Sequence, residues 1–214
     1  MKKYFLPIGK RQEEVLLPEE HVIYDIHGND AHVCPDIVAA TREAIRNPID
    51  SKPLREIVSA GETVTIIVSD ITRLCGTAEF LPVIVDELNS VGVKDEDITV
   101  IVATGTHRGH TPEEDVVVCG AEMVKRLKIV QHDSRKKEDM VSLGKTSFGN
   151  EVALSKYVVN ADRVILTGAV TLHPFAGFGG GRKAVMPGVA AYDSIMLNHC
   201  MTMSKIEGAG CNKA

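Results

Sequence analysis

The stretch VTIIVSDITR, residues 64–73, indicates the fold class of this sequence. Its first six residues form a nearly continuous run of β-branched side chains, which is typical of a strand covered on both faces. Three later runs have the same character: ITVIVA at 98–103, LKIVQ at 127–131 and RVILT at 163–167. An earlier run, HVIYDI at 21–26, is also expected to form a strand.

Helical patterns lie between these strands. Residues 36–46 and 77–90 carry apolar side chains at helical spacing. Thr111-Pro112-Glu113-Glu114 predicts a helix start, because it combines a capping hydroxyl, a first-turn proline and acids at the positive end of the helix dipole. A last helix is expected after Pro187-Gly188. Alternating strands and helices predict an α/β fold with a Rossmann-like, mostly parallel sheet and helices on both faces.

Composition excludes several classes of protein. The 214 residues are 44% hydrophobic and 25% charged, which is typical of a globular protein, and the net charge of 24 − 29 = −5 disfavours a nucleic-acid partner. Five cysteines without a C-x-x-C pair argue against a disulfide framework and favour a cytoplasmic protein. Residues 164–181, the longest stretch without Asp, Glu, Lys or Arg, contain five glycines, so no membrane span is expected. With no internal repeat or linker, we expect one domain over residues 1–214.

Chemically reactive side chains follow three of the expected strands. Ligands of open α/β sheets bind beyond the carboxyl ends of the strands. Residues 64–69 lead into Asp70-Ile71-Thr72-Arg73, residues 98–103 into a loop that contains His107, and residues 163–167 into a glycine-rich segment. If these strands are parallel, all three loops lie on one rim of the sheet, and this convergence predicts a functional site.

The glycine-rich segment matches no standard nucleotide-binding motif. Gly179-Gly180-Gly181 is followed by Arg182-Lys183, and glycines let a backbone approach a phosphate closely. A G-x-G-x-x-G match that starts at Gly177 requires glycine where Arg182 stands, and a P-loop requires glycine directly before Lys183. The alternative is a flexible turn, although a turn has no need for two basic residues after the glycines.

The other two loops offer proton-transfer and anion-binding groups. His107 and His173 both follow expected strands, and imidazole suits proton transfer near neutral pH. Arg73 is suited to a bidentate grip on a carboxylate or phosphate, whereas the alternative is a solvated arginine beside capping residues. His107 and His110 could in principle bind zinc, but no third ligand lies close in the sequence.

Four segments of the sequence, taken in order, resemble the lactate racemase family, whose members use a nickel-pincer nucleotide; they are Ser69–Arg73, Gly105–Arg108, His173–Lys183 and Asn198-His199. The resemblance extends to about residue 203. It implies that Lys183 binds the cofactor covalently through a thioamide and that His199 binds nickel. It also implies that His107 and His173 act as acid and base and that Arg73 holds the substrate carboxylate.

The resemblance further implies that Asp70, Thr72 and the loop Gly179, Gly180 and Gly181 contact the nucleotide, a pyridinium-3-thioamide-5-thiocarboxylic acid mononucleotide that carries nickel. One departure lies beside the substrate clamp, since many members have proline after the arginine and this sequence has Leu74-Cys75. Family members continue into a second lobe. The resemblance therefore implies that residues 1–214 are the N-terminal lobe and that the C-terminal lobe is absent from this chain.

The activity that follows from the resemblance is racemisation or epimerisation of a small 2-hydroxy acid by reversible hydride transfer. Expression without the cofactor-building enzymes is expected to give an apoprotein. Two alternatives remain open. One is a nicotinamide-dependent oxidoreductase, although the sequence lacks the G-x-G-x-x-G motif and an early glycine loop. The other is an isolated lobe that folds without turnover.

Overall fold

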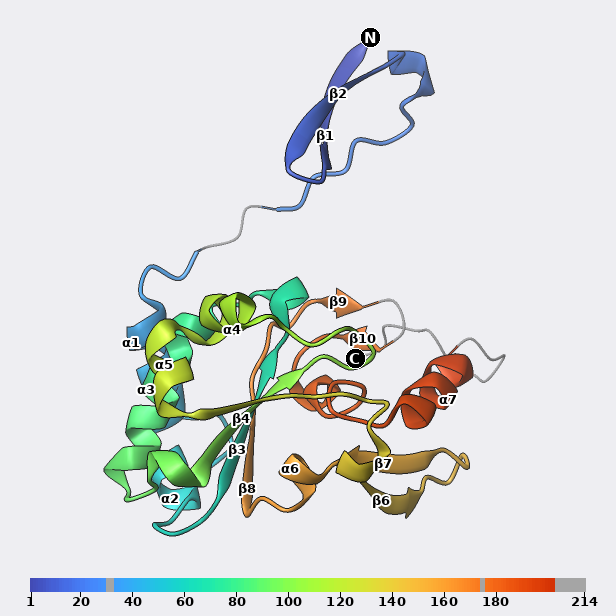
Figure 1. Ribbon diagram of the computed structural model, residues 1–214. Coiled ribbons are helices and arrows are strands. Elements are labelled where there is room, and N and C mark those ends of the chain that lie inside the picture. Colours follow the sequence, from blue (N-terminus) through green and yellow to red (C-terminus); the bar gives the residue numbers. More distant parts are fainter. Residues whose placement is uncertain (30–32, 174–175, 203–214) are drawn as a thin grey trace. The chain divides into compact units, whose positions relative to one another are not determined.

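The computed structural model describes residues 1–29, 33–173 and 176–202, and the chain divides into two compact units, Met1–Pro35 and Asp36–Ala214 (Figure 1). Two residues of the segment His173–Lys183, Pro174 and Phe175, and one of the five cysteines, Cys211, lie outside the described residues. Among the cysteines within the described ranges no disulfide forms, and no helix there is long and apolar enough to cross a membrane.

The first unit contains an antiparallel hairpin of β1 (Lys2–Ile8) and β2 (Arg11–Leu17), followed by the short 3₁₀ helix η1 (Glu19–His21). The sequence patterns did not predict this hairpin. The strand that it predicted at 21–26 is wrong, since that segment forms no strand and Ile23, Tyr24 and Ile26 are 84%, 82% and 86% exposed. An apolar run becomes a strand only where a neighbour pairs with its backbone, and here β1 and β2 pair with each other instead.

The second unit is built around a four-stranded parallel sheet. Its strands are β3 (Val64–Ser69), β4 (Ile98–Ala103), β5 (Lys128–Gln131) and β8 (Arg163–Leu166), in the spatial order β5-β4-β3-β8. All pairings are parallel, and Ser69 lies opposite Ala103 where β3 and β4 end. The four strands predicted here and the α/β class of the fold are therefore confirmed.

Helices cover the sheet, and two small hairpins lie outside it. The helices are α1 (Ile37–Arg46), α2 (Leu54–Ile57), α3 (Thr77–Ser90), α4 (Pro112–Cys119), α5 (Ala121–Arg126), α6 (Lys156–Val159) and α7 (Tyr192–Thr202). Short 3₁₀ helices are η2 (Ile71–Arg73), η3 (Asp95–Asp97), η4 (Lys137–Asp139) and η5 (Gly181–Ala184). The hairpins are β6 (Met140–Lys145) with β7 (Glu151–Ser155), and β9 (Leu172–His173) with β10 (Gly177–Phe178). The predicted start of α4 is confirmed by a capping box between Thr111 and Glu114.

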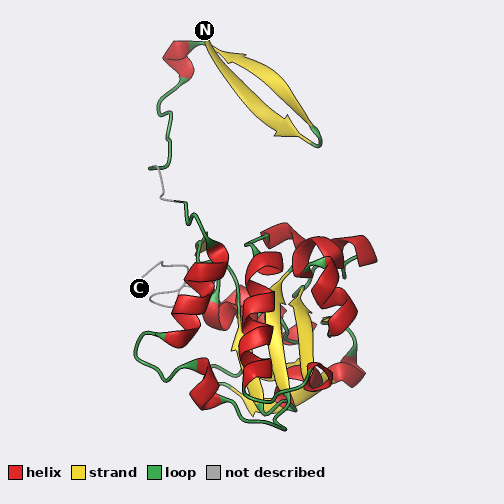
Figure 2. Ribbon diagram, turned by 90° about the vertical axis from the view of Figure 1, so that its left-hand side faces the viewer, coloured by secondary structure: helices red, strands yellow, loops and turns green. Residues whose placement is uncertain are grey.

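The hydrophobic core lies on both faces of the sheet, which explains the continuous apolar runs. Ile66 and Val100 face α3 and the helices beside it, where Leu81 is also fully buried. Ile67 and Ile101 face the other side and pack near α6 and the segment after η5. Figure 2 shows helices lying over the yellow strands of this unit. Burying each such side chain contributes roughly 1.5–3 kcal/mol, so the strand ends are held on a rigid scaffold.

Candidate functional site

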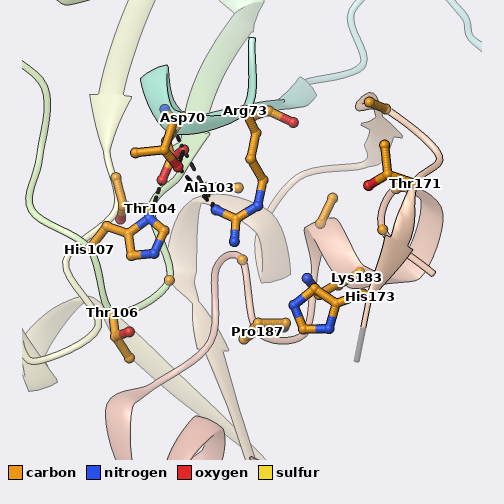
Figure 3. Close-up of a pocket in the computed structure, with 18 of the residues that line it drawn as sticks. Asp70, Arg73, Ala103, Thr104, Thr106, His107, Thr171, His173, Lys183 and Pro187 are labelled. Atoms are coloured by element: carbon orange, nitrogen blue, oxygen red, sulfur yellow. Dashed lines mark hydrogen bonds and ion pairs between the residues drawn. The ribbon is translucent and has the colours of Figure 1, made fainter. Parts of the chain in front are cut away.

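A cavity of about 370 Å³ opens at the carboxyl ends of β3, β4 and β8, where the sequence predicted convergence (Figure 3). Nine of the ten predicted site residues line it: Asp70, Thr72, Arg73, His107, His173, Gly179, Gly180, Lys183 and His199. Gly181, the tenth, begins η5 and is not part of the lining. The convergence occurs because β4 and β8 both pair with β3 in parallel, which brings all three exits to one edge.

The sequence analysis missed several polar and apolar lining residues, among them Ser69, Leu74, Thr104, Thr106, Thr167, Thr171, Pro187 and Ile195. Ser69, Thr104 and Thr167 stand at or directly after the ends of the three strands. Their position could have been found from the sequence, because every residue at such an exit faces the same edge of the sheet. Ile195 could not, since it reaches the cavity from α7 through the tertiary fold.

One side of the cavity, which we call the carboxylate side, is organised by Asp70 and also contains Thr72, Arg73 and His107. The Asp70 side chain is only 2% exposed. Its Oδ1 accepts hydrogen bonds from the Thr72 amide at 3.0 Å and the Thr72 hydroxyl at 2.6 Å, and its Oδ2 lies 2.5 Å from Nδ1 of His107. The Arg73 guanidinium lies 3.7 Å from the same carboxylate. Three neighbours therefore share one buried carboxylate.

Asp70 is held in its ionised form. Burial by itself raises the pKa of this carboxyl, because a low-dielectric environment disfavours charge. Hydrogen bonds from Thr72 and His107, with the positive charges of His107 and Arg73, outweigh burial and lower the pKa below its ordinary value of 3.8. Asp70 is thus an acceptor at neutral pH.

His107 is positioned by the loop after β4. Its backbone amide donates to the Thr104 carbonyl at 2.9 Å, and the Thr104 hydroxyl donates to the His132 carbonyl at 2.6 Å. The Gly105 amide donates to the Gly188 carbonyl at 2.9 Å, which ties this loop to the segment after η5. The ring is anchored through Nδ1 and about two-fifths exposed, so its other nitrogen is available to a ligand in the cavity.

His110 does not form a zinc site with His107. Its Nε2 accepts the Ile71 amide at 2.8 Å, so the proton of the neutral ring lies on Nδ1, 3.0 Å from Asp115. Both ring nitrogens are therefore used in structural hydrogen bonds. No group of three or more metal-binding side chains occurs within the described ranges of the chain.

The opposite side, which we call the lysine side, contains His173, Gly179, Gly180, Lys183 and His199. Gly180 has φ +72°, and a Cβ there would lie 3.0 Å from the Ala169 carbonyl oxygen, so both the backbone angle and the space favour glycine. Gly180 directly precedes η5, the short helix that carries Lys183. His199 reaches the cavity from α7.

The basic groups of the lysine side shift one another. Burial lowers the pKa of the Lys183 amine below 10.5, and the positive charge of Arg73 lowers it further. Burial also lowers the pKa of His173, and the charges of Lys183, Arg73 and His199 act in the same direction. Both shifts favour the neutral forms, which are the nucleophilic amine and the proton-accepting imidazole. The cavity can therefore bind an anion, move protons and form a covalent bond at the lysine.

Together, the fold and the cavity define an α/β domain with a ligand site at the carboxyl ends of its parallel strands. Comparison with known proteins gives the family. A family model described as the lactate racemase N-terminal domain matches residues 8–210, and the chain belongs to this family.

Two curated relatives are lactate racemases. The chain is 33% identical over 202 residues to the lactate racemase of Thermoanaerobacterium thermosaccharolyticum, covering 94% of this chain and 47% of the relative. It is 39% identical over 157 residues to the lactate racemase of Lactiplantibacillus plantarum, covering 73% of this chain and 37% of the relative. The chain thus spans less than half the length of either relative.

Solved structures agree with this assignment. The lactate racemase apoprotein from T. thermosaccharolyticum aligns with a TM-score of 0.80 and 31% identity, over 99% of this chain and 49% of that one. A crystal structure of a Thermotoga maritima protein aligns with a TM-score of 0.63 and 20% identity, over 82% of this chain and 44% of that one. The second likeness bears on the fold alone.

Proposed function

We propose that this chain is the cofactor-binding catalytic lobe of a racemase or epimerase that acts on a small 2-hydroxy acid of the lactate type. The observation that carries the proposal is the placement of an arginine, two histidines and a half-buried lysine around one cavity. These residues are Arg73, His107, His173 and Lys183. Membership of the lactate racemase N-terminal domain family supports the reaction class.

The residues around the cavity fit the nickel-pincer nucleotide. Lys183 lines the cavity, and its lowered pKa increases the neutral fraction of the amine, the form that enters a covalent linkage. His199 supplies an imidazole, which is a suitable ligand for nickel, and the nucleotide would provide the remaining ligands. Gly179 and Gly180 line the same cavity, and a glycine backbone lets a phosphate approach its N–H groups closely. When bound, this group would supply the reversible hydride acceptor that the exchange at C2 of the substrate requires.

The side chains of this lobe bind the substrate and move its proton. Arg73 is suited to hold the carboxylate, which keeps C2 in one place while its geometry changes. His107 takes the hydroxyl proton of one enantiomer as the C2–H bond breaks, and Asp70 stabilises the resulting imidazolium. His173 serves the hydroxyl of the other enantiomer from the lysine side. Asp70 acts through His107 and is a positioning residue.

The nicotinamide alternative gains no support from the structure. Dinucleotide-binding sheets carry a glycine loop at the turn between the first strand and its helix. Here the sheet's first strand, β3, leads into Asp70 and Arg73, and the glycine-rich segment follows the edge strand β8. The cytoplasmic location expected from the cysteines is part of the same proposal.

The first experiment concerns the activity. The chain, joined to the second lobe that its relatives carry and co-expressed with the cofactor-building enzymes, is assayed for racemisation over a panel of 2-hydroxy acids. We expect turnover of a lactate-type acid and a fall in kcat of about 10²–10⁴-fold for His107→Ala or His173→Ala. A surface variant, Lys94→Ala, serves as the control, since its ammonium is largely exposed. Loaded protein that racemises no acid in the panel contradicts the proposal.

The second experiment concerns the cofactor. Intact-mass and peptide-mass measurements on the active protein are expected to show an adduct on Lys183 and none after Lys183→Ala. The lysine control is again Lys94→Ala, which should retain the adduct. Active protein with unmodified Lys183 would overturn the covalent linkage.

A further inference from the structure

The two candidate histidines contact different kinds of group through the same ring atom. Nδ1 of His107 lies 2.5 Å from a carboxylate oxygen of Asp70. Nδ1 of His173 lies 3.2 Å from the backbone nitrogen of Ala176. An ionised carboxylate can only accept a hydrogen bond, whereas a backbone N–H can only donate one. Figure 3 shows the two rings in their places, on either side of the Arg73 guanidinium in this view.

From these contacts we infer that the neutral rings are opposite tautomers, with His107 protonated on Nδ1 and His173 protonated on Nε2. The hydrogen bond at one ring nitrogen determines which nitrogen carries the proton. His107 donates from Nδ1 to Asp70, which leaves a lone pair on Nε2. His173 accepts the Ala176 amide at Nδ1, which leaves the proton on Nε2.

The tautomer of His107 is firmly specified by its surroundings. The amide and hydroxyl of Thr72 both bind Oδ1 of Asp70, which leaves Oδ2 to accept from the ring. Asp70 is buried beneath the loop, and its low pKa keeps it an acceptor at any pH at which the imidazole is neutral.

The tautomer of His173 depends on the β9–β10 hairpin. His173 is the last residue of β9, and Gly177, at the start of β10, is its partner in the pairing. Ala176, directly before Gly177, donates its amide to the His173 ring. This hydrogen bond requires a lone pair at Nδ1.

This difference gives the two histidines unequal roles, and the assignment of those roles rests on the proposed function. His107 can take a hydroxyl proton at Nε2 directly: the O–H bond breaks and an N–H bond forms. A neutral His173 begins as a hydrogen-bond donor at Nε2 and becomes a base at that atom only after its proton has moved to Nδ1. That move breaks the hydrogen bond from Ala176, so base catalysis by His173 is coupled to the loss of this contact.

The test is the tautomeric state of both rings in the chain without cofactor. Two-bond ¹H–¹⁵N correlation spectra of ¹⁵N-histidine-labelled protein, recorded at about pH 9 where ordinary imidazoles are neutral, distinguish a protonated ring nitrogen from an unprotonated one. Signals are assigned by their loss in His107→Gln and His173→Gln. We expect a protonated Nδ1 at His107 and an unprotonated Nδ1 at His173. The same Nδ1 state in both rings overturns the inference.

Two variants of Asp70 extend the test. Asp70→Asn has only one side-chain oxygen, which the Thr72 amide holds at the Oδ1 position, so its NH2 group faces Nδ1 of His107 and is expected to turn the ring to the Nε2-protonated form. Asp70→Ala is expected to release the ring to the same form. An unchanged His107 spectrum in Asp70→Ala contradicts the role of the carboxylate. If Asp70→Ala does not fold, the spectrum of the unaltered protein still decides the inference. Because no turnover is measured, failure here is distinct from failure of the racemase proposal.

Discussion

The two sides of the cavity are assembled by different physical means. On the carboxylate side, each polar group meets a complementary one: Asp70 is shared by Thr72, Arg73 and His107. On the lysine side, the like charges of Lys183 and His199 lie near His173, and each pKa that shifts there is lowered. Asp70 is the one acidic side chain in the described lining of the cavity.

The difference indicates which side awaits a ligand. Complementary groups satisfy one another, so the carboxylate side is complete in the protein alone. Like charges held together by close backbone packing are unfavourable until an anion joins them. A nucleotide phosphate would therefore find its strongest attraction on the lysine side, and the two sides should respond differently to mutation and pH.

The largest effect is expected for Gly188→Ala, which breaks the backbone packing behind the lysine side. A Cβ at this position would lie 2.1 Å from the Ala184 carbonyl oxygen and 2.9 Å from the Ala103 Cβ, so the backbone after η5 must move. We expect a loss of about 3 kcal/mol in the free energy of unfolding, which corresponds to a fall in Tm of roughly 6–12 °C for a chain of this size. Thermal unfolding followed by circular dichroism measures it.

Gly109→Ala is the matched control on the loop after β4. Neither glycine has a positive φ, but a Cβ at Gly109 would meet only Gln131 side-chain atoms, at 3.6 Å and beyond. Its effect should stay within about 0.5 kcal/mol. Equal losses for the two variants would show that packing does not distinguish the two sides.

Acid should weaken the lysine side before the carboxylate side. The pKa of His173 is lowered in the folded chain, so the unfolded chain takes up its proton first, and stability falls as the pH drops below about 6.5. The pKa of Asp70 is also lowered, but its contribution is lost only as the pH drops below about 4. Urea unfolding across pH measures both contributions. We expect each group to add less than one proton to the number that the chain takes up on unfolding.

Variants separate these two contributions. His173→Gln should reduce the loss of stability between about pH 6.5 and 5, and Asp70→Asn the loss below about pH 4. The pKa of buried His132 is lowered as well, so His132 adds its own pH dependence in the same range. The contribution of His173 is therefore the difference between the unaltered chain and the His173→Gln variant. An unchanged pH dependence above pH 5 in His173→Gln would contradict the electrostatic description of the lysine side.

The sequence predicted the scaffold better than the contacts. The bounds of β3, β4 and α3 were predicted correctly, because burial on both faces or along one stripe leaves a strong local pattern. The predicted convergence at the sheet edge is confirmed, since it requires only parallel pairing. The β1–β2 hairpin was missed because its strands expose apolar residues, and local sequence does not say which segment will pair.

The link between Asp70 and His107 also could not be predicted. These residues are 37 positions apart, and the sequence analysis associated Asp70 with the nucleotide. Their contact follows from the register of β3 and β4, in which Ser69 lies opposite Ala103, so that the loops leave the sheet side by side. The register depends on the whole sheet. A nucleotide contact for Asp70 remains a prediction, with its carboxylate already bound to Thr72 and His107.

The smallest effect, and the one that bears most directly on the lysine side, is a gain of stability from Lys183→Met. Burial and Arg73 lower the pKa of Lys183, so at neutral pH its charged form is less favourable in the folded chain than in the unfolded one. Methionine keeps the apolar length and removes the charge, and we expect Tm to rise by about 1–2 °C at pH 7 in the chain without cofactor.

The gain should shrink as the pH approaches about 10.5, because unfolded lysine then loses its charge as well. Lys94→Met, at a largely exposed position, should leave Tm unchanged. A Lys183→Met chain that is less stable than the original at pH 7 would mean that the ammonium is already satisfied by the protein. A gain that disappears at high pH would mean that the lysine side is destabilised by its own charge, which is the state from which binding of an anionic nucleotide yields the largest stabilisation.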